Sequence, residues 1–89
     1  MKCTRFLVSG RVQGVFYRAT AAKKARELGI TGHASNRPDG RVEVLACGSE
    51  ESVRAFGEWL WVGSSGSKVT GVDASDAAPA QLPKDFGTG

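Results

Sequence analysis

Hydrophobic periodicity changes along this chain in an order that restricts the fold more than any other feature of the sequence. Alternation at period two marks a strand with one buried face, and steps of three and four mark an amphipathic helix. The expected elements are a strand over 4–9, a helix over 17–28, strands over 30–36 and 41–47, a helix over 49–62 and a strand over 68–74. An 89-residue chain builds a single core, so all of these elements must share it.

This order of elements predicts the fold class. Strand, helix, strand, strand, helix, strand (βαββαβ) is the order of a ferredoxin-like two-layer sandwich of the α+β class, in which a four-stranded antiparallel sheet carries two helices on one face. Asp39-Gly40 supplies a tight reversal between the second and third strands, and Ser49 is a natural helix N-cap. We expect residues 1–89 to form one domain. The fold alone leaves the function open, because enzymes, RNA binders and regulatory modules share it.

Composition and charge narrow the function classes. The formal net charge of +3 arises from basic residues that are scattered along the chain, which favours small anions over nucleic acid as partners. The longest strictly apolar run, Trp59 to Val62, is far shorter than the roughly 20 residues of a membrane span. The first five residues lack the apolar region of a secretory signal. We therefore expect a cytoplasmic protein with neither a membrane nor a nucleic acid as its partner.

Candidate metal ligands are sparse. Cys3, Cys47 and His33 are too few and too widely separated to indicate a metal site. The chain also offers no recognisable Ser/His/Asp set. Any catalysis is expected to use other groups, with no metal and no cofactor.

A glycine-containing segment links the first strand to the first helix, and it reads Gly10-Arg11-Val12-Gln13-Gly14-Val15-Phe16-Tyr17-Arg18. Successive backbone N–H groups at a helix amino terminus form a ready anion site. Gly10 and Gly14 permit positive φ or close backbone approach, and the guanidinium of Arg18 can hold two phosphate oxygens. Spacing alone leaves a second interpretation open, in which the glycines only turn the chain. No Lys-Ser or Lys-Thr follows Gly14, so magnesium nucleotide chemistry is not expected.

The same segment resembles the signature of the acylphosphatase family, and the resemblance extends from residue 5 to about residue 74. The matching residues are Gly10-Arg11-Val12-Gln13-Gly14-Val15, Arg18, Gly29, Gly32, Asn36, Asp39-Gly40, Val42 and Gly48. The resemblance implies an enzyme, an acylphosphate phosphohydrolase. Such an enzyme converts acyl phosphates, the mixed anhydrides of carboxylic and phosphoric acids, to carboxylate and inorganic phosphate. It would use neither a metal nor a covalent enzyme intermediate.

Carried across residue by residue, the resemblance makes Arg18 and Asn36 the catalytic residues. Asn36 would orient the attacking water, because an uncharged amide can accept from water and donate to a phosphoryl oxygen. The phosphoryl group, or inorganic phosphate or sulfate in its place, would be bound by Gln13, Gly14, Val15, Phe16, Tyr17 and Arg18. The departing carboxylate has a conjugate acid with a pKa of about 4, so it needs no protonation at neutral pH.

Topology bears on the role of Asn36. Taken alone, Asn36 would be interpreted as a turn former before Arg37-Pro38. In the predicted fold, however, the second strand runs parallel to the first, so Asn36 and Gly14 should lie at the same edge of the sheet. Tyr17 is expected to pack beneath the loop.

The two cysteines raise a separate question. The predicted fold pairs the first and third strands antiparallel, which brings Cys3 beside Cys47 on the face opposite Phe6 and Val8. This placement allows a disulfide, whereas cytoplasmic redox conditions favour free thiols. Both states remain open on sequence grounds.

Rival functions and the carboxyl end complete the expectations. A non-catalytic anion- or RNA-binding module on the same fold remains the alternative, although an RNA reader should expose aromatics on central strands. The open face is instead expected to show Arg5, Leu7, Arg41, Glu43 and Leu45. We expect a monomer.

At the carboxyl end, residues 76–83 should form an extended connection, and whether residues 86–89 add an edge strand anchored by Phe86 stays open.

Overall fold

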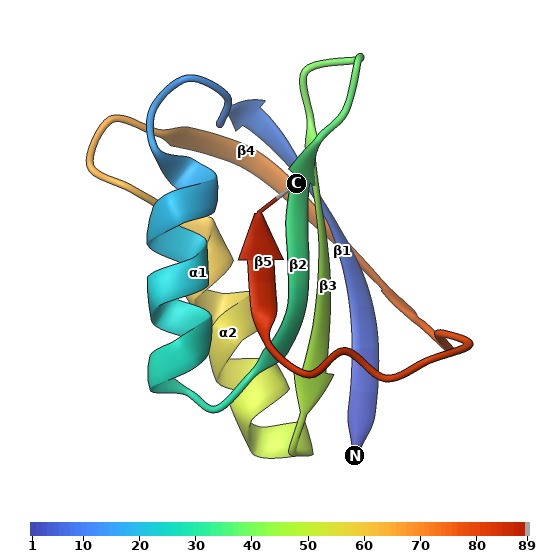
Figure 1. Ribbon diagram of the computed structural model, residues 1–89. Coiled ribbons are helices and arrows are strands. Elements are labelled where there is room, and N and C mark those ends of the chain that lie inside the picture. Colours follow the sequence, from blue (N-terminus) through green and yellow to red (C-terminus); the bar gives the residue numbers. More distant parts are fainter. Residues whose placement is uncertain (89) are drawn as a thin grey trace.

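The computed structural model describes residues 1–88, which form a five-stranded mixed sheet with two helices packed on one face (Figure 1). The elements are β1 (Lys2–Arg11), α1 (Tyr17–Glu27), β2 (Thr31–Asn36), β3 (Val42–Gly48), α2 (Glu50–Val62), β4 (Lys68–Asp76) and β5 (Phe86–Thr88). The strand order is β4-β1-β3-β2-β5. β1 pairs antiparallel with β3 and β4, and β2 pairs antiparallel with β3. Within the described chain, no helix has the length and apolar character needed to cross a membrane.

The expectation of a four-stranded antiparallel sheet is wrong, because β5 extends the sheet as a parallel neighbour of β2. Phe86 fixes this strand: its ring is buried and meets Phe56 edge-on, with 5.8 Å between ring centroids. The Gly32 N–H donates to the Asp85 carbonyl over 2.9 Å, and the Arg26 guanidinium donates to the Phe86 carbonyl over 2.8 Å. A strand of three residues is too short to show alternation, so periodicity could not predict it.

The core lies between the helices and the sheet, as the periodicity predicts. Its sheet side is formed by alternate residues of β1 and β3, namely Phe6, Val8, Val42 and Val44. Its helix side is formed by Ala21, Ala22, Ala25, Val53, Phe56 and Leu60. Trp59 packs against this core and stacks on Phe56, with ring centroids 6.1 Å apart, whereas Trp61 is 54% exposed. Only one of these two tryptophans therefore packs against the core.

The opposite face of the sheet is covered near the end of β3. Cys3 and Cys47 occupy directly paired positions of β1 and β3 and are joined by a disulfide. The Ala77 N–H donates to the Cys3 carbonyl over 3.1 Å, which brings the connection between β4 and β5 across this end of the sheet (Figure 1). Leu45 and Cys47 are therefore buried, although alternation placed them on an open face.

Gly10 has a different role from the one expected of it. β1 does not end there but continues to Arg11, and a β-bulge shifts the register of its pairing with β4 between Ser9 and Gly10. The φ of Gly10 is 118°, and a Cβ there would overlap the carbonyl oxygen of Lys68. Glycine is required at this position because β4 approaches closely, not because a loop wraps around an anion.

Candidate active site

The loop between β1 and α1 (residues 12–16) and the turn between β2 and β3 (residues 37–41) lie at the same end of the sheet (Figure 1). β1 and β2 run parallel, because both pair antiparallel with β3. Val8 and Asn36 lie on either side of Val42 in the sheet register. The end of β2 is therefore level with Val8, three residues before the end of β1, and Asn36 lies towards the same end of the sheet as the loop, as the topology predicts.

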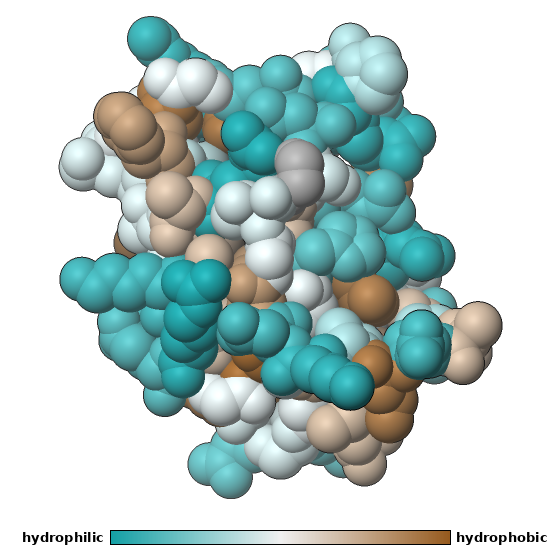
Figure 2. Space-filling model, viewed as in Figure 1, coloured by the Kyte–Doolittle hydropathy of each residue, from teal (hydrophilic) through white to brown (hydrophobic). Residues whose placement is uncertain are grey.

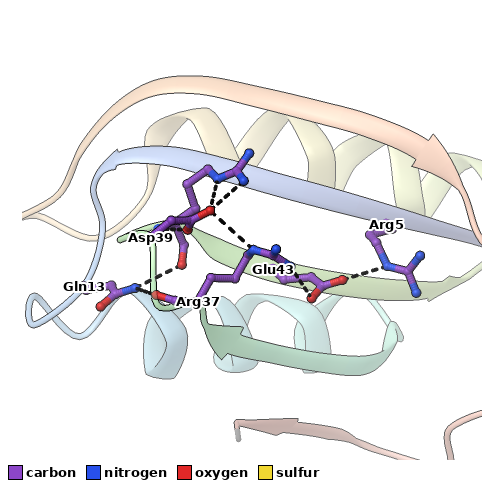
Figure 3. Close-up of polar contacts among 6 residues, drawn as sticks. Arg5, Gln13, Arg37, Asp39 and Glu43 are labelled. Atoms are coloured by element: carbon purple, nitrogen blue, oxygen red, sulfur yellow. Dashed lines mark hydrogen bonds and ion pairs between the residues drawn. The ribbon is translucent and has the colours of Figure 1, made fainter.

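Gln13 joins the loop to the turn. Its side-chain nitrogen donates to the carbonyls of Arg37 and Arg41, over 2.9 and 3.0 Å (Figure 3). Two hydrogen bonds from one amide leave Gln13 no freedom to swing, and they span the segment that directly follows Asn36. The Gln13 side chain thus fixes the position of Asn36 relative to the loop. From the sequence, Gln13 was expected to contribute only its backbone amide.

Two further contacts orient the loop amides. The hydroxyl of Ser64 donates to the Val15 carbonyl over 2.8 Å, and the backbone N–H and hydroxyl of Thr20 donate to the Phe16 carbonyl over 3.0 and 2.8 Å. None of the described peptide bonds is cis, and in a trans peptide the C=O and N–H groups point in opposite directions. The N–H groups of Phe16 and Tyr17 therefore point away from these partners, and that of Tyr17 points out of the amino-terminal end of α1.

The loop backbone adopts conformations that few residues tolerate. Gly14 has φ 74°, with open space where a Cβ would be, so glycine serves the backbone angle rather than close packing. Phe16 has φ 59° and ψ 22°, the left-handed region, and it is the one non-glycine residue with positive φ among residues 1–88. A bulky residue in this region is uncommon and costs roughly 1–3 kcal/mol.

The amino terminus of α1 is open to an anion. Within the described chain no side chain caps it, and its first turn contains no acidic residue. The first N–H groups of a helix have no partner within the helix, and with the helix dipole they present positive potential at this point. Arg18, in the first turn of α1 and partly buried, adds a fixed positive charge beside them.

A pocket of about 290 Å³ lies against this helix end. Its lining consists of Val12, Gly14, Phe16, Tyr17, Arg18, Ala19 and Thr88. Four of the residues predicted to bind phosphate line it, whereas Gln13 and Val15 are turned towards their own partners. Asn36 is exposed at the end of β2 and is not part of the pocket lining.

Tyr17 supports the floor of the pocket. Its ring is 1% exposed, and its hydroxyl donates to the Leu60 carbonyl of α2 over 2.7 Å. Burial raises the pKa of this phenol well above its usual value, so Tyr17 stays protonated at any physiological pH. The expectation that Tyr17 packs beneath the loop is confirmed.

Charged residues of the turn and of the open sheet face are paired with one another (Figure 3). The Arg41 guanidinium donates to Asp39 over 2.6 and 2.9 Å, and this hydrogen bonding lowers the pKa of Asp39 to about 2. Glu43 accepts ion pairs from Arg5 at 2.8 Å and from Arg37 at 3.3 Å. These contacts stiffen the turn that follows Asn36 and leave the three arginines engaged.

A second and larger pocket, of about 670 Å³, lies between α2 and β4. Lys2, Arg54, Glu58, Trp61 and Asp76 are among its lining residues. Its lining includes none of the predicted site residues and no residue of the β1–α1 loop. Pocket volume therefore does not identify the candidate active site. The smaller pocket is the one lined by Arg18 and by residues of the β1–α1 loop, the residues expected to bind phosphate.

Several contributors to the site escaped sequence analysis. Thr88 reaches the pocket through β5, which periodicity did not predict. Ser64 and Thr20 act through single hydroxyl contacts on loop carbonyls. Such contacts leave no periodic signal, although Thr20 lies four residues after Phe16, the spacing at which a helical hydroxyl reaches back to a carbonyl.

Known proteins that are similar to this chain share one family name. The acylphosphatase family model matches residues 4–88. A protein of Methylococcus capsulatus named acylphosphatase is 54% identical over 78 residues, which cover 88% of this chain and 85% of that protein. The solved structure of acylphosphatase from Bacillus subtilis superimposes with a TM-score of 0.94 at 36% identity, covering 99% of this chain and 98% of that one. The structure of an acylphosphatase from Coxiella burnetii gives a TM-score of 0.91 at 39% identity, over 98% and 90% of the two chains.

Proposed function

Since the chain belongs to the acylphosphatase family, we propose that it works by direct attack of water on phosphorus, with the phosphoryl group bound at the amino terminus of α1. Membership of the family makes the chain an enzyme that hydrolyses acyl phosphates to carboxylate and inorganic phosphate. The observation that carries the mechanism is the uncapped helix end, with its inward amides beside Arg18.

The phosphoryl group is held by the loop amides from Gln13 to Arg18 and by the Arg18 guanidinium. In phosphoryl transfer, negative charge spreads over the three equatorial oxygens, and catalysis depends on positioning and charge stabilisation. The N–H groups of Phe16 and Tyr17 are oriented before substrate arrives, because their peptides are held by Ser64 and Thr20. Donors fixed in advance stabilise the transition state without a cost of reorganisation.

Asn36 orients the attacking water. Its side chain is exposed at the end of β2, so the amide can accept from a solvent water through its oxygen and donate to a phosphoryl oxygen through its nitrogen. Gln13 holds the following turn against the loop, which fixes the approach of Asn36 to the phosphoryl group. This is positioning and not proton abstraction, and the carboxylate leaving group needs no general acid.

We also propose that the enzyme is a cytoplasmic monomer and that it acts on a small acyl phosphate without metal or cofactor. Reading of RNA on the open sheet face is not favoured. The arginines on that face, Arg5, Arg37 and Arg41, are engaged with Glu43 and Asp39, so they offer little free charge to a phosphate backbone.

Hydrolysis of acetyl phosphate in water enriched in heavy oxygen, with EDTA present, tests this function. We expect turnover to proceed in EDTA and the heavy oxygen to appear in inorganic phosphate, because water attacks phosphorus. Label in the acetate instead would mean attack on the carbonyl carbon and would overturn the mechanism. Loss of turnover in EDTA that returns on addition of a divalent metal would overturn its independence of metal.

A further inference from the structure

Phe16 presents its ring to solvent at the mouth of the pocket. The residue is 83% exposed, yet its carbonyl is held by both the backbone and the hydroxyl of Thr20. The other exposed large hydrophobic residues do not line this pocket: Met1 is at the chain start, Trp61 and Val62 are on α2, and Leu82 is in the connection to β5. An aromatic ring beside an anion site needs a reason beyond packing.

Two costs accompany this placement. The left-handed backbone of Phe16 is strained for a residue with a bulky side chain, and the exposed ring gains none of the free energy of burial. Glycine would adopt the same φ without strain. Backbone strain of this kind concentrates at functional sites, so the observed outlier directs attention to what the ring contacts when substrate is bound.

Apolar side chains contribute to the lining of the pocket beside Phe16, together with polar groups. Val12 and the ring of Tyr17 are 1% exposed and close its floor, and the methyl group of Ala19 lies on its rim. A small group of brown and tan residues lies at the upper left of Figure 2, the side on which Figure 1 places the β1–α1 loop. A site for inorganic phosphate alone would not need these groups.

The geometry of the reaction places the acyl group on this side. In-line displacement requires the leaving group to lie opposite the attacking water. Because Asn36 orients the water from the end of β2, the acyl group must leave along a wall that Asn36 does not form. Only one bridging oxygen separates the phosphorus from the acyl carbon, so the acyl chain begins within the pocket that Phe16 and Ala19 border.

We propose that Phe16, with Val12 and Ala19, forms an acyl-binding subsite that selects acyl phosphates with an aromatic or extended apolar acyl group. This inference rests on the proposed function of the loop as the phosphoryl site. The ring of Phe16 covers one face of the bound acyl group, and the loop amides determine where the phosphoryl group lies. The subsite therefore discriminates between large and small acyl groups, whereas the phosphoryl site binds all substrates alike.

Substrate pairs measured on Phe16 variants test the subsite. The readout is the ratio of kcat/KM for benzoyl phosphate to that for acetyl phosphate, which cancels any effect on the shared phosphoryl site. In Phe16→Asn, which tolerates the left-handed backbone, we expect this ratio to fall about fivefold to tenfold, the range of one aromatic contact. Phe16→Tyr keeps the ring and should keep the ratio, as should Trp61→Asn, which removes an exposed aromatic far from the pocket. An unchanged ratio in Phe16→Asn would overturn the subsite.

A measurement on the unaltered protein keeps the proposal open to refutation if Phe16→Asn fails to fold. Phenacylphosphonate and acetonylphosphonate carry a methylene group in place of the bridging oxygen and differ only in phenyl against methyl. As competitive inhibitors of acetyl phosphate hydrolysis, phenacylphosphonate should have an inhibition constant about fivefold or more below that of acetonylphosphonate. Equal constants would refute the subsite and leave the phosphoryl site intact. Failure to hydrolyse either acyl phosphate would instead refute the function on which the subsite rests.

Discussion

The two helices of this protein begin in opposite ways. α2 starts at Ser49, whose extended backbone lets its hydroxyl accept from the Ser52 N–H over 3.1 Å, and Glu50 and Glu51 place negative charge in the first turn. α1 starts after Phe16, in the left-handed region, with neither a side-chain cap nor an acidic residue in its first turn among the described residues. One helix end is capped by its own residues, and the other, without such a cap, is where we propose that the phosphoryl group binds.

This difference separates stability from function within a single small domain. Capping of the α2 terminus favours the folded state at all times, because its partners are part of the chain. Among the described residues the α1 terminus lacks that stabilisation, and in the proposed mechanism its N–H groups bind a phosphoryl oxygen. Changes at the start of α1 should therefore alter catalysis more than folding, and changes at the start of α2 should alter folding more than catalysis.

The largest effect is expected from Arg18→Ala, which removes the fixed charge beside the open helix end. We expect kcat/KM for acetyl phosphate to fall about 10²-fold or more, because a charged clamp on the phosphoryl group is lost. Inhibition by inorganic phosphate should weaken in parallel. Lys23→Ala, which removes an exposed cation from the same helix, is the matched control and should retain wild-type kinetics. Equal losses in both variants would mean that general charge, and not the position of Arg18, attracts the substrate.

Giving α1 the acidic first turn of α2 should weaken the site. Ala19 is exposed in the first turn, and Ala19→Glu places a carboxylate beside the bound anion. We expect KM and the inhibition constant of phosphate to rise about tenfold, while the free energy of unfolding rises by about 0.3–1 kcal/mol through the helix dipole. Ala19→Gln, of similar size without charge, should show much smaller changes. Tighter phosphate binding in Ala19→Glu would contradict an anion site at this terminus.

Removing the cap of α2 should lower stability and leave activity nearly unchanged, the reverse of the effects expected at α1. Ser49→Ala deletes the acceptor for the Ser52 N–H, and we expect the free energy of unfolding to fall by about 1 kcal/mol in urea titrations. Because Ser49 lies outside the pocket lining, kcat/KM should stay within about twofold of the wild type. A large loss of activity at unchanged stability would break the division between the two helix ends.

A smaller, pH-dependent effect is expected at Tyr17, the first residue of α1 and the only tyrosine in the sequence. Burial raises its pKa above the ordinary value of 10.0, so above about pH 10 the unfolded chain loses the phenol proton and the folded chain keeps it. Stability from this group is therefore complete below pH 10 and declines as the pH rises. The phenolate absorbance should appear only as the protein unfolds in alkali. Titration of the phenol near pH 10 in the folded protein would show that the ring is accessible.

The sequence predicts those parts of the fold that depend on repeated patterns. Alternation in β1 and β3 places Phe6 and Val44 in the core, and the Ser49 cap marks the start of α2 within one residue. β5 could not be predicted, since three residues carry no period and Phe86 joins the sheet through tertiary packing. The burial of Cys47 likewise depends on a distant connection that crosses the sheet.

The site was predictable to the extent that it depends on backbone conformation and strand order. The positive φ of Gly14, and the shared sheet end of the loop and Asn36, follow from spacing and from the parallel direction of β1 and β2. The hydrogen bonds of the Gln13 side chain do not, because they depend on where the turn carbonyls point after folding. Gly10 matched the expected motif, but its glycine is needed for the approach of β4.

The central claim is that Asn36 turns an anion-binding helix end into a hydrolytic site, and the Asn36→Ala variant tests it most directly. Turnover of acetyl phosphate and competitive inhibition by inorganic phosphate should be measured on the same preparation. We expect kcat to fall about 10²-fold, because the water loses its positioning group, while the inhibition constant of phosphate stays within about threefold of the wild type. Retention of wild-type kcat would contradict the role of Asn36, and so would a loss of phosphate binding as large as the loss of turnover.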